Sequence, residues 1–375
     1  MANRKGTLEK MVNEVYKNKR VFVTGHTGFK GSWLTCWLHE MGAFVKGYSL
    51  SPPNKDDLYN LIRGDEICNS VIGDIRDSEK LKKELLDFQP EFVFHLAAQP
   101  IVRHSYVFPK ETFDVNVIGT VNILDALRSL SSSCIAVIIT TDKVYENLET
   151  EDVYTEYDRL GGYDPYSASK ACAELVISSF RNSFFNIKQY DQHLKSISSA
   201  RAGNVIGGGD WAKDRIIPDI IRSLINNEPI EIRNPHSVRP WQHVLDSISG
   251  YLLLAANQRN NPIKYAEAFN FGPVLNDIKR VRELAELAVK SWGEGVINYH
   301  QSEKNFHEAS LLRLDISKAT KLLGWQPRYD SDTAIAKTIA WYKKFNNLGR
   351  DSARDLMIND IRDYIDIKEG YLTNE

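Results

Sequence analysis

The sequence has little cysteine, no long apolar run and almost no net charge. Its 375 residues include four cysteines, which lie far apart without metal-ligand spacing: Cys36, Cys68, Cys134 and Cys172. We expect reduced core thiols of a cytoplasmic protein, and neither a disulfide framework nor a metal site. No apolar run approaches the ~18–20 residues of a membrane span. The charged N-terminal stretch lacks the apolar core of a signal peptide.

The net charge of −2 gives no overall attraction to nucleic acid or to a membrane surface. Hydrophobic residues make up 42% and charged residues 26% of the chain, as in an ordinary globular protein. The length suits one large domain or two fused units.

The first half of the chain alternates short apolar runs with amphipathic ones. The apolar runs are VFVTG, FVKGYSL, SVIGDI, FVFHLAA, AVIITTD and SISSARAGNVIG. Their alternation with helical segments predicts an α/β fold, a Rossmann-type doubly wound parallel sheet covered on both faces.

The pattern changes near Gly207, where loops lengthen and helical runs dominate. We expect a Rossmann domain that binds a dinucleotide over residues 1–206, mainly 19–206. A smaller mixed substrate-binding lobe, interleaved with the sheet domain, is expected over residues 207–375. The charged last residues, about 350–375, are expected to lie loosely on the surface.

Three glycines at intervals of three follow the first predicted strand and open a helix: Gly25, Gly28 and Gly31. A helix N-terminus presents free N–H groups, and glycine lets the backbone approach a pyrophosphate. The motif therefore predicts a dinucleotide site, although such glycines also mark plain tight turns. The segment GYSLSPPN offers neither acid nor arginine to decide between NAD and NADP. Asp74 could reach the adenine end of the cofactor, or could serve as a helix N-cap or turn residue.

Tyr166 and Lys170 lie four residues apart in YSASK and would share one face of a helix. A tyrosine with its ordinary pKa of about 10 is a poor base, but a nearby ammonium and a cationic nicotinamide would favour the phenolate. Thr140, Thr141 and Asp142 end the preceding strand at the carboxyl edge of the sheet, where open α/β folds bind ligands. Tyr166 is thus a candidate base for a sugar hydroxyl, with a surface Tyr–Lys pair as the alternative.

These elements together resemble the extended short-chain dehydrogenase/reductase family. The motifs that carry the resemblance are VTGHTGFKGSWL, FHLAAQP, TTDKVYEN, GGYDPYSASKACAE, ARAGNVIGGGDWA, RPWQHV and HEASLLRLDISKATKLLGWQP. The similarity covers about residues 19–342. TTDK, GGGDWA and RPWQH are more specific, and resemble the branch of CDP-glucose 4,6-dehydratases.

The resemblance implies a carbon–oxygen lyase that uses bound NAD in an internal redox cycle on CDP-glucose. Hydride moves from carbon 4 of the glucosyl unit to NAD, water is lost across carbons 5 and 6, and the hydride returns to carbon 6. The product would be CDP-4-dehydro-6-deoxyglucose, for 6-deoxysugar biosynthesis in lipopolysaccharide O-antigen. Alternatives on the same fold are another nucleotide-sugar 4,6-dehydratase, an epimerase, and a non-catalytic nucleotide-binding regulator.

By the resemblance, the catalytic residues are Thr141, Asp142, Lys143, Tyr166 and Lys170. Thr141 polarises the carbon 4 oxygen, and Asp142 protonates the departing hydroxyl. Lys143 replaces the glutamate base of dTDP-glucose enzymes and is assigned to the carbon 5 proton. Its alternative role is a salt bridge that keeps Asp142 ionised. The Asp–Lys pair favours a dehydratase over an epimerase, and the intact Tyr–Lys pair argues against a regulator.

The resemblance also implies binding residues. For the cofactor they are Gly25, Thr27, Gly28, Phe29, Lys30, Gly31, Asp74, Ile75, Leu96, Ala97, Ala98, Asn116, Tyr166 and Lys170. For the substrate they are Gln99, Arg201, Asn204, Asp210, Trp211, Arg215, Arg239 and His307, with the arginines on the diphosphate. The helices near 112–130 and 166–180 resemble those that form a four-helix bundle, which implies a homodimer or homotetramer.

Overall fold

The computed structural model describes residues 14–148, 152–300 and 312–367. Seven parallel strands form one sheet in the order β12-β7-β5-β4-β1-β2-β3. The predicted doubly wound parallel sheet is confirmed, with its switch point between β1 and β4. The strands are β1 (Arg20–Thr24), β2 (Phe44–Ser49), β3 (Asn69–Ile72), β4 (Phe92–His95), β5 (Cys134–Ile139), β7 (Lys195–Ala202) and β12 (Ala268–Phe271).

Both faces of this sheet are apolar. Successive residues of a strand point to opposite faces, so a strand made of consecutive apolar residues places apolar side chains on both. Val21 and Val23 of β1 belong to a core shared with helices α2 (Phe29–Glu40) and α11 (Val244–Asn260). Phe22 belongs to a second core, shared with α4 (Ser78–Phe88), α7 (Gly119–Arg128) and α8 (Pro165–Ser183). Continuous apolar runs in the sequence therefore become strands buried on both sides.

Strand β12 and helix α11 come from the C-terminal half of the chain, yet lie with the sheet. Six strands were predicted, and the seventh, β12, was missed because its sequence, AFNF, is only four residues long. The boundary at residues 206 and 207 stays a prediction.

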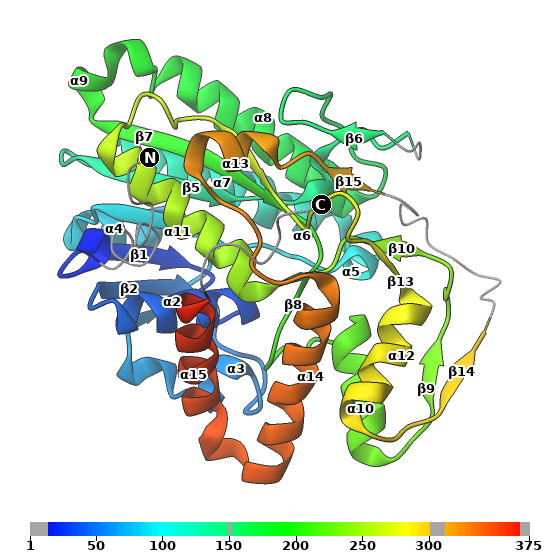
Figure 1. Ribbon diagram of the computed structural model, residues 1–375. Coiled ribbons are helices and arrows are strands. Elements are labelled where there is room, and N and C mark those ends of the chain that lie inside the picture. The colour runs from blue at the N-terminus through cyan, green and yellow to red at the C-terminus, as the bar shows by residue number, and fades with distance from the viewer. Residues whose placement is uncertain (1–13, 149–151, 301–311, 368–375) are drawn as a thin grey trace, which may run out of the picture.

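The remaining described elements are mostly short. Figure 1 shows α10, α12, β9 and β14 together to one side of the sheet. Helical segments are α3 (Leu58–Leu61), η1 (Gly64–Glu66), α5 (Val102–Val107), α6 (Pro109–Phe113), the π-helix η2 (Asp114–Ile118), η3 (Asp142–Val144), η4 (Ile187–Gln189), α9 (Tyr190–His193), α10 (Ile216–Asn226), α12 (Val281–Trp292), α13 (Ser317–Leu323), α14 (Ser331–Leu348), η5 (Arg350–Ser352) and α15 (Ala353–Asp366). Short strands pair as β6 (Val153–Tyr154) with β15 (Arg313–Leu314), β8 (Val205–Ile206) with β11 (Gln242–His243), β9 (Ile230–Ile232) with β14 (Ile297–Tyr299), and β10 (Val238–Arg239) with β13 (Lys279–Arg280).

The expectation of a loose C-terminal segment is wrong for the part that the structure describes. Helix α15 buries Met357, Ile361 and Tyr364, which recur at helical spacing among charged residues. It contacts α2, beside which it runs in Figure 1. Residues 368–375 lie outside the described residues. None of the described helices is long and apolar enough to cross a membrane.

Candidate active site

The turn between β1 and α2 leaves no room for side chains at two of its glycines. Gly25 has a φ of +74°, and a Cβ there would lie 2.7 Å from the backbone nitrogen of Ala97. A Cβ on Gly31 would overlap the carbonyl oxygen of Gly25. Gly28 is the exposed N-cap of α2, and no side chain caps it. The turn therefore presents the helix N-terminus to a ligand, and it fits a pyrophosphate.

The other predicted cofactor residues lie around this turn or on neighbouring strand ends. The Thr27 hydroxyl bonds to Ser49 and to the carbonyl of Leu50, both at 2.9 Å. Two more groups follow β3 and β4 at the same carboxyl edge, namely Asp74 with Ile75, and Leu96 with Ala97 and Ala98. Asp74 accepts hydrogen bonds from the guanidinium and the backbone of Arg76, as in its alternative role of turn residue.

The predicted catalytic residues meet where β5 and α8 come together. Thr141, Asp142, Tyr166 and Lys170 are all buried. The Thr141 hydroxyl donates to Asp142 Oδ1 at 2.9 Å. Its proximity to the phenol opposes the rise that burial causes in the pKa of Tyr166. Lys170 Nζ donates to the carbonyl oxygen of Ile139 at 3.3 Å. Lys143 is half-buried and follows Asp142 in the same 3₁₀ turn, η3.

Local sequence explains why α8 begins where Tyr166 is needed. Asp164 is its N-cap and forms a capping box with Ser167, while Pro165 occupies the first turn. The buried hydroxyl of Ser105 accepts the N–H of Tyr166 at 3.2 Å. The helix start is therefore fixed both by its own sequence and by α5.

Burial dominates the electrostatics of these groups. It raises the pKa of Tyr166 to about 12, against a hydrogen bond from Thr141 and the charge of Arg215. It also raises the pKa of Asp142, against the charges of Lys143 and Arg239. A carboxyl with a raised pKa holds its proton more readily, which suits an acid. Burial lowers the pKa of Lys170 to about 8.

Lys30 extends from the glycine turn toward these residues. Its Nζ donates to the hydroxyl of Tyr251, a buried residue of α11, at 3.3 Å. Burial and the charges of Arg215 and Lys170 lower the pKa of Lys30 to about 7, while Asp142 raises it. The cofactor turn and the catalytic residues thus share one electrostatic environment.

The three predicted arginines lie in different settings. Arg215 pairs with Asp210 at 2.8 Å and remains partly exposed, and its charge acts on Tyr166. The charge of Arg239 acts on Asp142. Arg201 is 4% exposed and pairs with buried Glu174 at 2.9 Å. Because its guanidinium is buried and paired with Glu174, Arg201 is not among the proposed diphosphate ligands.

Gln99 and Asn116 form a polar link to the tyrosine helix. Asn116 accepts the N–H of Gln99 at 2.8 Å and donates to Ser169 Oγ at 2.8 Å. Ser169 in turn donates to the carbonyl of Tyr166. Asn116 lies in the π-helix η2, a distortion that is frequent at functional sites. The side chain of Gln99 itself bonds to Ile101 in its own loop and to Thr112 of α6.

Other substrate residues lie in loops of the C-terminal half. The carbonyl of Asn204 accepts the N–H of Gln242 at 3.0 Å, and Trp211 packs on Tyr342. His307 lies outside the described residues. Among the described residues, no three or more His, Cys, Asp or Glu side chains are grouped so that they could hold a metal ion.

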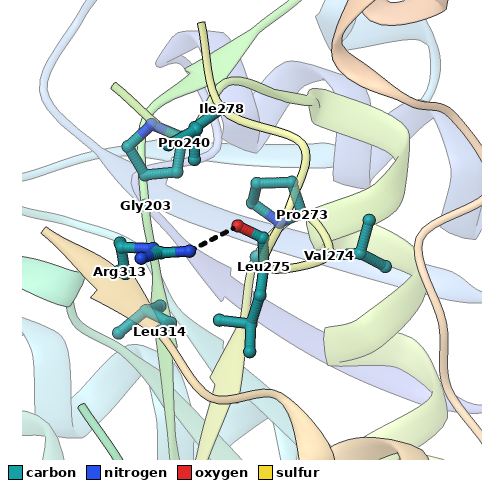
Figure 2. Close-up of a pocket in the computed structure, with 9 residues that line it drawn as sticks. Gly203, Pro240, Pro273, Val274, Leu275, Ile278, Arg313 and Leu314 are labelled. Carbon is teal, nitrogen blue, oxygen red and sulfur yellow. Dashed lines mark hydrogen bonds between the residues drawn. The ribbon is translucent and has the colours of Figure 1, made fainter. Parts of the chain in front are cut away.

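A small, mostly apolar pocket lies between Gly203, Pro240 and Arg313, and no sequence motif predicted it (Figure 2). A Cβ on its lining residue Gly203 would lie 3.0 Å from Asp142 Oδ2. Arg313 donates to the carbonyl of Leu275 across it at 3.0 Å. Its walls come from strand β15 and from loops far apart in the sequence: Gly203, Pro240, Gly272, Pro273, Val274, Leu275, Ile278, Arg313 and Leu314.

A glycine turn on a parallel sheet, with a buried Tyr–Lys helix and a threonine at the strand end, defines a protein of the short-chain dehydrogenase/reductase class. The chain belongs to the family described as GDP-mannose 4,6 dehydratase, whose model matches residues 22–338. It is 51% identical over 328 residues to CDP-glucose 4,6-dehydratase of Salmonella typhimurium, covering 88% of this chain and 91% of that protein.

Solved structures share the fold. An epimerase from Methanothermobacter thermautotrophicus has a TM-score of 0.77 at 24% identity, covering 92% of this chain and 98% of that one. A dTDP-glucose 4,6-dehydratase from Streptomyces venezuelae with NAD bound has a TM-score of 0.74 at 24% identity, covering 88% and 98%. Because dehydratases and epimerases share this architecture, the activity must be argued from the site.

Proposed function

We propose that the chain is a CDP-glucose 4,6-dehydratase that converts CDP-glucose to CDP-4-dehydro-6-deoxyglucose and water. The observation that carries the proposal is the Asp142–Lys143 pair directly after Thr141, beside Tyr166. An epimerase needs no such acid–base pair. The 51% identity to a CDP-glucose 4,6-dehydratase supports both the reaction and the nucleotide.

NAD is the proposed cofactor, with its pyrophosphate at the N-terminus of α2. Gly25, Gly28 and Gly31 would let it approach the backbone, and Lys30 would lie between this turn and the catalytic residues. When bound, NAD supplies a hydride acceptor that returns the hydride later in the cycle.

Tyr166 is the proposed base for the carbon 4 hydroxyl, with Thr141 as its hydrogen-bond partner at the same oxygen. The buried phenol has a pKa of about 12, so the protein alone keeps it protonated near neutral pH. A positively charged nicotinamide ring and the Lys170 ammonium would favour the phenolate. Lys170 then acts through its charge and through the hydrogen bond that fixes it to β5.

Asp142 is the proposed acid for the hydroxyl on carbon 6, and Lys143 the base for the proton on carbon 5. Burial raises the pKa of Asp142, so a protonated carboxyl becomes accessible at the pH of the reaction. The charge of Lys143 acts in the opposite direction, because it favours the ionised carboxylate.

Arg215 and Arg239 are the proposed ligands of the substrate diphosphate. Each guanidinium can offer two parallel N–H donors to phosphate oxygens. Their charges act on Tyr166 and Asp142 respectively, so the phosphates would lie next to the reacting sugar. Asn204, Asp210 and Trp211 would frame the nucleotide or sugar.

The proposed substrate is tested by incubating the purified chain with CDP-glucose and, separately, with UDP-, GDP- and dTDP-glucose. We expect a 4-keto product from CDP-glucose at a rate well above the other three. Equal rates with another donor would reassign the nucleotide, and no 4-keto product from any donor would reject the dehydratase.

Isotope labelling separates a dehydratase from an epimerase. Substrate deuterated at carbon 4 should give deuterium in the new methyl group, whereas ordinary substrate in heavy water should gain deuterium at carbon 5. An epimerase keeps the carbon 6 hydroxyl and gives no methyl signal. Methyl deuterium drawn from solvent would contradict the internal return of hydride.

Four broader statements belong to the same proposal. The domain division rests on the change of sequence pattern near Gly207 and the compartment on the scattered cysteines, whereas the assembly and the pathway rest on the family resemblance. Residues 1–206 would form the cofactor domain and residues 207–375 the substrate lobe. The chain would assemble as a homodimer or homotetramer through α7 and α8. It would act in the cytoplasm, and its product would enter 6-deoxysugar biosynthesis for lipopolysaccharide O-antigen.

A further inference from the structure

Helix α8 carries a buried carboxylate to which the proposed mechanism gives no role. Glu174 lies four residues after Lys170 and eight after Tyr166, so the three side chains follow one face of the helix. The Glu174 side chain is 1% exposed. Its Oε1 accepts a 2.6 Å hydrogen bond from Thr140, and its Oε2 accepts 2.9 Å hydrogen bonds from Ser199 and Arg201. Three donors on one buried carboxylate indicate a built network.

These hydrogen bonds join α8 to the end of β5. Lys170 binds the carbonyl of Ile139, and Glu174 binds the side chain of the next residue, Thr140. Thr141 and Asp142 follow immediately. Two successive turns of the helix therefore hold two successive residues of the strand end, which sets the position of Thr141 relative to the helix that carries Tyr166.

Glu174 also acts on Lys170 through its charge. Burial disfavours the Lys170 ammonium, and the Glu174 carboxylate opposes that effect. Burial opposes ionisation of Glu174, but the charge and hydrogen bond of Arg201 and the hydrogen bond from Thr140 outweigh it and lower the pKa of this carboxylate. The other titratable groups that interact with these two residues are Arg181 on α8, Lys30 on α2 and the buried His95 on β4.

We propose that Glu174 is a positioning residue of this enzyme, which fixes the strand end bearing Thr141 and Asp142 and places a buried carboxylate one helical turn from Lys170. The inference rests on the proposed function, because it concerns the same site. It gives a reason for the buried Glu174–Arg201 pair, whose burial is otherwise costly.

The variant Glu174→Gln removes the charge and keeps an oxygen that can accept from Thr140. Lys170 should then lose its proton at lower pH, and with it the charge that favours the Tyr166 phenolate. We expect the alkaline limb of the kcat profile to move down by about one pH unit or more. The KM for CDP-glucose should change by less than about threefold. An unchanged alkaline limb in a folded variant would overturn the inference.

Two further variants separate charge from geometry. Glu174→Asp keeps the charge but shortens the side chain, so kcat should fall while the alkaline limb stays in place. Glu156→Gln is the matched control, since Glu156 also acts on Arg201 but is not among the groups that act on Lys170. Its alkaline limb should equal that of the wild type. If Glu174→Gln alone does not fold, Glu174→Gln/Arg201→Met removes the whole ion pair and should show the same displaced limb.

A measurement without substrate tests the inference separately from the proposed function. In protein with isotope-labelled lysine, the Lys170 signal can be assigned by its loss in Lys170→Arg and followed against pH. Its titration midpoint should fall by about one pH unit or more in Glu174→Gln. An unmoved midpoint rejects the inference, whereas failure to convert CDP-glucose rejects only the proposed function.

Discussion

Tyr166 lies in an environment that opposes its proposed work as a base. The same burial that positions its hydroxyl against Thr141 raises its pKa to about 12. Nearby positive charges, Arg215 among them, must therefore compensate for lost solvation. At the scale of single residues, catalysis here depends on placing cations around a buried phenol.

Replacing Tyr166 with phenylalanine should remove the base and preserve ring packing. We expect turnover of CDP-glucose to fall by roughly 10²–10⁴-fold, the usual contribution of a positioned acid or base. The thermal unfolding midpoint should be nearly unchanged. Tyr163→Phe is the control, because Tyr163 is close in sequence and 77% exposed. Near-normal turnover in Tyr166→Phe would reject the assignment.

Lys143→Ala tests the second half of the reaction. Without the proposed carbon 5 base, oxidation at carbon 4 should proceed and elimination should slow. The 4-keto-glucose intermediate should then accumulate together with the absorbance of reduced nicotinamide. Lys188→Ala, at an exposed lysine of η4, should behave as the wild type. If Lys143 serves only as an ion-pair partner of Asp142, no such accumulation will appear.

At the scale of elements, the β1–α2 turn matters because its path excludes side chains. Gly25→Ala would place a methyl group against the backbone of Ala97 in a left-handed conformation. We expect the variant to be purified with little or no NAD(H), whereas the wild type should release it on denaturation. Gly324→Ala is a matched control, because Gly324 has a φ of +71° with open space around it. It should cost about 1 kcal/mol of stability and retain cofactor.

Helix α15 forms a hydrogen bond to the buried carboxyl group of Asp246 on α11. Asp246 Oδ1 accepts from Tyr364 at 2.8 Å and from the N–H of Arg328 at 2.7 Å, while Oδ2 is buried without a partner. The guanidinium of Arg328 also donates to the carbonyl of Tyr364. Burial raises the pKa of Asp246 to about 7. The helix therefore packs on a carboxyl that prefers to be protonated.

Asp246→Asn should change how stability depends on pH. The folded state holds the Asp246 proton up to about pH 7, whereas the unfolded state releases it near its ordinary pKa of about 3.9. The wild type therefore loses stability relative to the variant as pH rises from about 4 to 7. Urea unfolding at pH 5 and pH 8 should show the variant gaining relative stability at pH 8. Asp125→Asn, at a partly exposed site, should show no such trend, and an equal difference at both pH values would contradict the buried titration.

At the scale of the whole molecule, α8 and its neighbour η2 expose large apolar side chains. Leu175 of α8 is 59% exposed and Ile118 of η2 is 48% exposed, and the two elements are in contact. We expect these surfaces to pair across a two-fold axis, so that light scattering at micromolar concentration gives a dimer or larger even-numbered mass. Leu175→Glu should lower that mass, while Leu348→Glu, at an equally exposed site on α14, should not. A monomer mass for the wild type would contradict the proposal.

The sequence by itself determined six strands of the sheet, the glycine turn and the local placement of most of the proposed catalytic residues. These features depend on local patterns, because strand alternation, a helix cap and a four-residue spacing are set by neighbours along the chain. For the same reason Tyr166 and Lys170 could be assigned to one helix face, and Thr141 and Asp142 to a strand end.

Only the tertiary structure decided which polar side chains are buried and paired with one another. Arg201 looked like a diphosphate ligand in sequence, but folding pairs it with Glu174, 27 residues earlier. The same holds for three other features. The pocket lined by Gly203 and Arg313, the pairing of β12 with β7 and the packing of α15 on α2 each bring together segments far apart in the chain. Contacts of this kind depend on how layers stack and which charges lose solvent, and no local pattern specifies either.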